Sequence, residues 1–158
     1  MTQFRRELVL VGTKSELTRI SRFVEEACDG ANVDPAARFD LQMAVDEACC
    51  NVFEHAYSGS AGEIDLRFET RGQDVVITLQ DHGRTFNPEV VPPPDTTSPL
   101  EERPVGGLGL HLMRKLMDKV FFAFSPERGN TLVMEKHKVV PGAPKKGSSE
   151  GQSAKPSK

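Results

Sequence analysis

A glutamate and an asparagine stand four residues apart in the stretch DEACCNVFEHAY, residues 46–57. Because positions i and i+4 are neighbours on a helix surface, Glu47 and Asn51 would share one face of a helix. A carboxylate can accept a proton from an attacking hydroxyl, and a carboxamide oxygen is a suitable ligand for Mg²⁺. Asn51 alone would more often be an ordinary helix amide, but the pair indicates a polar site beside an apolar helix face.

Two further segments contain groups that a fold alone does not require. In DHGRTF, Asp81 ends an expected strand, and Gly83 would let the backbone pass close to a ligand. In VGGLGLHL, Gly106, Gly107 and Gly109 precede an expected helix N-terminus, where unpaired N–H groups can bind phosphate. This glycine turn is a weak signal alone, since it lacks the Gly-Lys-Ser/Thr of a P-loop. The three segments together, in this order, indicate one common site.

The three segments resemble the asparagine box and the two glycine boxes of the GHKL ATPases. Within that superfamily the chain is similar to the bacterial anti-sigma factor serine/threonine kinases, through HAY after the asparagine and GGLGL running into a helix with LMD. The resemblance covers residues 4–138. It implies a histidine-kinase-like ATP-binding domain of the Bergerat type over residues 1–140, with ATP and Mg²⁺ as cofactors.

The resemblance also implies a role for each site residue. Asn51 would coordinate a magnesium ion that bridges the ATP phosphates, and Glu47 would be the catalytic base toward a substrate hydroxyl. Asp81 would bond the adenine amino group, and Gly83 would let its loop approach the base. Thr131, on a late strand, would lie near the same aspartate. The phosphate-contacting turn matches three glycines, Gly106, Gly107 and Gly109, and the ATP lid matches residues 87–105.

By the same resemblance, the protein is expected to bind a sigma factor and to phosphorylate a STAS-type anti-sigma factor antagonist in a partner-switching pathway that regulates transcription. Family members commonly form homodimers. An alternative from another class is a nucleotide-bound binding module that sequesters a regulatory partner without phosphoryl transfer. ATP hydrolysis, as in larger relatives of the superfamily, is less favoured because no transducer domain follows.

Composition excludes several other classes of function. A net charge of −3 over 158 residues argues against nucleic-acid binding as the main task. No apolar run approaches the length of a membrane span, and the N-terminus does not read as a signal peptide. The three cysteines have neither disulfide-framework nor metal-ligand spacing, so we expect a cytoplasmic protein.

Hydrophobic periodicity predicts the elements that must position these residues. Strands are expected over 4–12, 63–68, 74–81, 120–124 and 130–139, and helices over 14–29 and from 35 to about 57. Residues 106–120 open with glycines and then become a third helix. Hairpins without regular crossovers favour an α+β two-layer sandwich, with a mixed, mostly antiparallel sheet and helices on one face. Residues 141–158 have almost no apolar side chains and are expected to form a disordered tail.

Overall fold

The computed structural model describes residues 3–85 and 105–141, so the expected lid and tail lie almost entirely outside the described residues. The order of helices and strands is the one predicted from the sequence. The elements are β1 (Arg5–Gly12), α1 (Leu17–Ala31), α2 (Pro35–Asn51), β2 (Gly62–Arg71), β3 (Asp74–Asp81), α3 (Val105–Leu116), β4 (Lys119–Ser125) and β5 (Gly129–Lys136).

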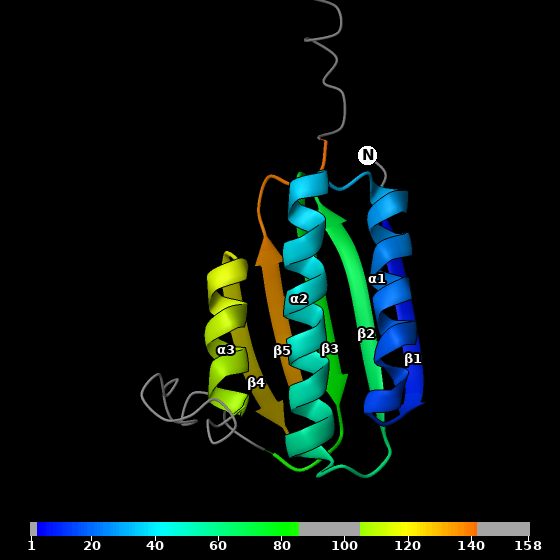
Figure 1. The fold of residues 1–158 in the computed structure, drawn as a ribbon, viewed down its shortest axis with the longest axis vertical. Helices are drawn as coiled ribbons and strands as arrows, with labels where there is room; N and C mark the ends of the chain where they lie inside the picture. Colours follow the sequence, from blue (N-terminus) through cyan, green and yellow to red (C-terminus); the bar gives the residue numbers. More distant parts are fainter. Residues whose placement is uncertain (1–2, 86–104, 142–158) are drawn as a thin grey trace, which may run out of the picture.

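The five strands form one sheet in the order β1-β2-β3-β5-β4, and every neighbouring pair is antiparallel. The sheet of the described residues is therefore antiparallel throughout, rather than mixed as expected. The reason is visible in Figure 1: the single helix α3 leaves β4 running in the same direction as β3, but β5 lies between them. The one pair of strands that could have paired in parallel across a helix is thus separated.

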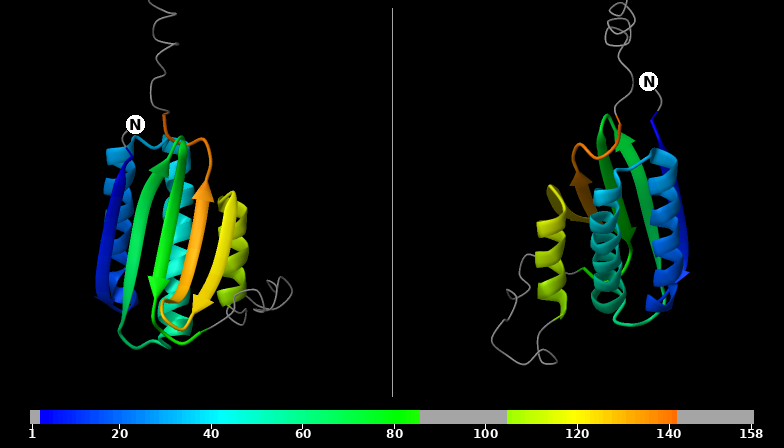
Figure 2. Two further views of the ribbon diagram at one scale, coloured as in Figure 1. Left: turned by 180° about the vertical axis from the view of Figure 1, so that it is seen from behind. Right: turned by 45° about the horizontal axis from the view of Figure 1, so that its top comes forward.

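The three α-helices cover one face of the sheet, and no helix of the described residues covers the other (Figure 1, Figure 2). Strand alternation accounts for this arrangement. In β2, Ile64, Leu66 and Phe68 are buried toward the helices, whereas the residues between them are less buried. The largest fully buried side chains come from both layers: Phe53, Phe68, Ile20, Leu41, Ile64, Leu66, Ile77 and Leu79. This confirms the predicted two-layer α+β sandwich.

The end of α2 departs from regular α-helical geometry. Pro35 opens the helix, and after Asn51 the chain continues as a π-helical turn over Val52–Ala56. The amide of Tyr57 donates to the carbonyl of Val52 over 3.0 Å, five residues back. The predicted helix to about residue 57 is therefore confirmed, with a wider last turn. Such π turns recur at functional sites.

The three cysteines are free, two of them buried and Cys50 half-buried. Cys28 and Cys49 are small residues of the core. In the part of the chain that the structure describes, no helix combines the length and the apolar character needed to cross a membrane.

Candidate active site

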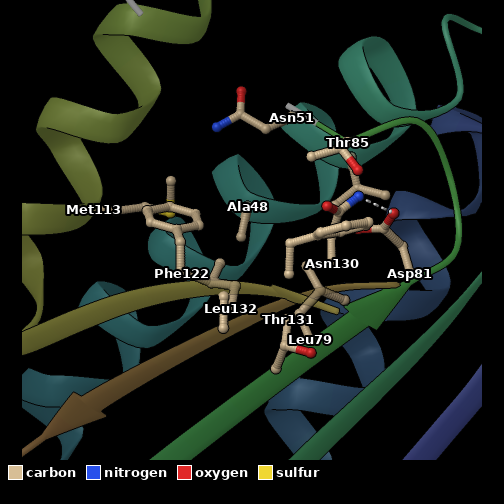
Figure 3. Close-up of a pocket in the computed structure, with 13 residues that line it drawn as sticks. Ala48, Asn51, Leu79, Asp81, Thr85, Met113, Phe122, Asn130, Thr131 and Leu132 are labelled. Carbon is tan, nitrogen blue, oxygen red and sulfur yellow. Dashed lines mark hydrogen bonds between the residues drawn. The ribbon is translucent and has the colours of Figure 1, made fainter. Parts of the chain in front are cut away.

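A cavity of about 260 Å³ lies where α2 and α3 meet the ends of β3, β4 and β5 (Figure 3). Its walls are mainly apolar, and its polar groups are few. Leu79, Met113, Phe122 and Leu132 line it together with Ala48. An apolar pocket with a small number of placed polar groups is typical of a small-molecule site.

Asp81 is the more deeply buried of the two buried polar residues that line this cavity in the described part of the chain, with 2% of its surface exposed. Its Oδ1 accepts two hydrogen bonds of 2.9 Å, from the amide of Gly83 and from Nδ2 of Asn130. Within the described residues, Oδ2 accepts no hydrogen bond. Burial raises the pKa of this carboxyl, and the two hydrogen bonds oppose the shift. Asp81 is thus held by one oxygen and leaves the other for a donor in the cavity.

The residue of the last strand that bonds Asp81 is Asn130. Asn130 stands directly opposite Asp81 in the β3–β5 register, so both side chains project from the same face (Figure 3). Thr131 also borders the cavity, but it is paired with Gln80, so the pleat directs its side chain to the other face. The expected Thr131 therefore borders the same cavity as Asp81, while Asn130, which the sequence did not single out, is the residue of β5 that bonds the carboxylate.

Gly83 is required by a close approach of its backbone to the backbone of Ala56. A Cβ added at this position would lie 2.6 Å from the carbonyl oxygen of Ala56, at the end of α2. The next residue, Arg84, donates its amide to the same oxygen over 2.7 Å, and its guanidinium reaches the carbonyl of His55. The loop after Asp81 is therefore packed directly on the π turn that follows Asn51.

Asn51 is buried, with 6% of its surface exposed, and lines the cavity. Its carboxamide makes no hydrogen bond to any residue that the structure describes. This side chain is available to a ligand in the cavity.

Glu47 is half-buried and lies one helical turn before Asn51, although it does not itself line the cavity. Burial raises the pKa of this carboxyl, and the negative charges of Asp46 and Glu54 raise it further. Glu54 in turn pairs with Lys14 over 2.6 Å. Glu47 therefore holds a proton more readily than an ordinary glutamate, as a base needs to do.

The three glycines lie within α3 rather than before it, since the helix begins at Val105. The unpaired N–H groups of a helix belong to its first four residues, which here include Gly106 and Gly107 but not Gly109. The same helix contributes Met113 to the cavity. The backbone donors expected at this position are thus supplied by the first turn of the helix itself.

Among the described residues, no group of three or more histidine, cysteine, aspartate or glutamate side chains could hold a metal ion. A transition-metal centre of that kind is therefore not formed by this part of the chain. Magnesium, by contrast, keeps several waters and commonly binds substrate phosphates with few protein ligands. The carboxamide of Asn51 fits that chemistry.

Comparison with known proteins identifies the family of this chain. Residues 10–136 match the family described as the histidine kinase-like ATPase domain. The serine-protein kinase RsbW of Bacillus mycoides (strain KBAB4) is 35% identical over 102 residues, and RsbW of Bacillus thuringiensis (strain Al Hakam) is 34% identical over 102 residues. Each alignment spans 62% of this chain and 62% of the relative's length. The chain belongs to the histidine kinase-like ATPase family, and these relatives confirm its predicted resemblance to the serine kinases within it.

Proposed function

We propose that the protein is an ATP- and Mg²⁺-dependent protein serine/threonine kinase. The observation that carries the proposal is the placement of Glu47 one turn before Asn51, whose amide makes no hydrogen bond to a described residue and lines the same cavity as Asp81. The names of the relatives, serine-protein kinases, support the same activity. A phosphoryl-transfer site needs chiefly positioning and charge neutralisation, together with a group that takes the proton of the attacking hydroxyl.

The cavity fits a nucleotide base. The open oxygen of Asp81 would accept a hydrogen bond from the adenine amino group. The apolar side chains of Leu79 and Phe122 would enclose the ring. Asn51 would ligate Mg²⁺, and the first-turn amides of α3 would bind the phosphates. When bound, Mg²⁺-ATP supplies the phosphoryl group, and the metal neutralises its negative charge.

Glu47 would accept the proton of the substrate hydroxyl as that oxygen approaches the phosphate. A base works best when its pKa lies near the working pH, and burial and the two neighbouring carboxyls move the pKa of Glu47 in that direction. Replacement of this side chain should therefore reduce transfer more than it reduces nucleotide binding.

The substrate we propose is a serine on a STAS-type anti-sigma factor antagonist, and the second partner is a sigma factor that the protein holds inactive. The resemblance of the sequence motifs to the anti-sigma factor kinases supports both. A phosphoserine carries close to two negative charges, which would expel the antagonist from its interface by repulsion and desolvation. The pathway would then act as a cytoplasmic partner switch, with a homodimer as the expected form of the kinase.

The proposal is tested by incubating the pure protein with γ-labelled ATP and the STAS proteins of its own genome, with and without Mg²⁺. We expect Mg²⁺-dependent label on one serine, and no label when that serine is replaced by alanine. A protein that binds Mg²⁺-ATP and its partners but labels no STAS serine would instead be the sequestering module.

A further inference from the structure

Tyr57 connects the end of α2 to two strands through its hydroxyl group. The hydroxyl donates a hydrogen bond to the carbonyl of Glu63 over 2.6 Å and accepts one from the amide of His82 over 3.0 Å. Glu63 is the second residue of β2, and His82 directly follows Asp81 at the end of β3. One phenol oxygen therefore joins three elements beside the cavity.

The position of this hydroxyl follows from the strand register. Ile64 pairs with Asp81, so Glu63 and His82 would form the next antiparallel pair. The phenol oxygen stands between these two residues and replaces their direct contact with a bridge. The two strands separate at this point, and β3 ends at Asp81.

Gly62 provides the space for the Tyr57 ring. A Cβ added to Gly62 would lie 2.4 Å from ring carbons of Tyr57, which is closer than side-chain atoms can pack. Because Gly62 is the first residue of β2, the ring lies flat against the start of that strand. The ring and its hydroxyl thus have a fitted position rather than a chance surface contact.

The segment that leaves Asp81 is held at successive residues. The amide of His82 bonds the Tyr57 hydroxyl, the amide of Gly83 bonds Asp81 itself, and the amide of Arg84 bonds the carbonyl of Ala56. Two of these three acceptors belong to Ala56 and Tyr57, which are neighbours at the end of the π turn that follows α2. The carboxylate of Asp81 is consequently fixed relative to the helix that carries Asn51.

We propose that Tyr57 is a positioning residue for adenine recognition, because its hydroxyl holds the chain at His82 so that Asp81 presents its open oxygen to the cavity. This inference rests on the proposed nucleotide site. Tyr57 acts through Asp81 and does not line the cavity itself. The hydroxyl should therefore affect how often the site is ready to bind, and not the chemistry of the bound state.

The change Tyr57→Phe removes only the hydroxyl and keeps the ring on Gly62. The loop would then spend part of its time away from the binding geometry, and the apparent Kd would rise in inverse proportion to the fraction that remains competent to bind. The net contribution of the one hydrogen bond to His82 corresponds to about a 3–10-fold weaker ATP affinity. The transfer rate at saturating ATP should stay at the wild-type value, so the KM rises while kcat does not fall.

A matched control is available at the other end of β2. There the hydroxyl of Thr70 accepts a hydrogen bond from the amide of Phe4 over 3.1 Å. The change Thr70→Val removes this comparable hydrogen bond far from the cavity. This variant should lose stability to a similar extent and keep wild-type ATP affinity. It separates a local effect on Asp81 from a general loss of stability.

Amide hydrogen exchange of the nucleotide-free protein, followed by NMR, tests the positioning directly. In Tyr57→Phe the amides of His82 and Gly83 should exchange faster than in wild type, whereas in Thr70→Val they should not. Calorimetry with Mg²⁺-ATP on the same three proteins then measures the affinities. Faster exchange together with weaker ATP binding in Tyr57→Phe alone supports the inference.

The possible failures are distinguishable. Wild-type exchange at His82 and Gly83 in Tyr57→Phe, or unchanged ATP affinity in that variant, overturns the role of Tyr57 and leaves the proposed function standing. A lower rate at saturating ATP with unchanged affinity also overturns it. Failure of the wild type to bind Mg²⁺-ATP overturns the proposed function, and the inference with it.

Discussion

Replacement of Asp81 by asparagine separates nucleotide recognition from folding. Among the described residues, both hydrogen bonds of the carboxylate go to one oxygen, which accepts from Gly83 and from Asn130. An asparagine that places its carbonyl oxygen in the same position would keep both hydrogen bonds. Its NH₂ group would then occupy the place of the open oxygen and face the cavity. The variant should fold, but its NH₂ group would face the adenine amino group, and both groups are hydrogen-bond donors.

The size of the two effects follows from this geometry. A donor facing a donor in a buried site leaves both unsatisfied, which costs about 1–3 kcal/mol, or roughly a 5–150-fold loss of ATP affinity. The folding stability of Asp81→Asn at neutral pH should instead equal or exceed that of wild type. Burial raises the folded-state pKa of Asp81. The contribution of this one carboxyl to stability is therefore greatest below its ordinary pKa of 3.8 and is lost as the pH rises through the folded-state pKa. Asparagine does not titrate, so this part of the decline should disappear.

Calorimetry at neutral pH and thermal unfolding as a function of pH measure the two effects. We expect weaker ATP binding by Asp81→Asn, a Tm at neutral pH no lower than that of wild type, and a flatter decline of stability from acid pH upward. Selectivity should also move from ATP toward GTP, because the guanine O6 accepts a hydrogen bond where adenine donates one. Unchanged ATP affinity in a folded Asp81→Asn protein would refute the assignment of the adenine site.

Three further changes test other parts of the account. Gly83→Ala should lower the free energy of unfolding by about 1–3 kcal/mol in a denaturant titration, because the added Cβ meets a fixed backbone oxygen; a neutral result would contradict that close approach. Asp46→Asn removes a negative charge that raises the pKa of Glu47, so the acid limb of the transfer rate against pH should move to lower pH, and an unmoved limb would argue against Glu47 as the base. Deletion of residues 142–158 should leave the Tm unchanged, whereas deletion of 139–158 should lower it, since the two valines at the start of that segment are buried; calorimetric scans of both truncations decide this.

Much of the fold could be predicted because its signals are local. Alternation in β2 and the proline at the start of α2 identify a strand and a helix from neighbouring residues alone. The sheet order could not be predicted in this way. The insertion of β5 between β3 and β4 is decided by packing between segments far apart in the sequence, and it makes the described sheet antiparallel throughout.

The site shows the same division between local and non-local information. Motif spacing placed Asn51 and Asp81, which both line the cavity. Spacing did not reveal which residue of β5 faces Asp81, because a shift of one residue in a strand moves the side chain to the other face. Asn130 therefore became apparent only from the register. The contact of Tyr57 with His82 likewise depends on the end of one helix meeting the end of a distant strand.

Transfer of phosphate by a Glu47→Gln variant tests the central claim most directly. The measurement is the rate of label transfer from saturating Mg²⁺-ATP to the acceptor serine, with the ATP affinity of each protein determined in parallel. Glu54→Gln is the matched control, because it changes another carboxylate close to Glu47. The carboxylate of Glu54 pairs with Lys14.

If Glu47 is the base, Glu47→Gln should bind Mg²⁺-ATP like wild type and transfer phosphate about 10²–10⁴-fold more slowly, while Glu54→Gln stays close to wild type. Asn51→Ala should differ from both and weaken nucleotide binding as well. Transfer by Glu47→Gln at the wild-type rate, or a wild-type protein that binds Mg²⁺-ATP and transfers no phosphate to any cognate antagonist, would contradict the account.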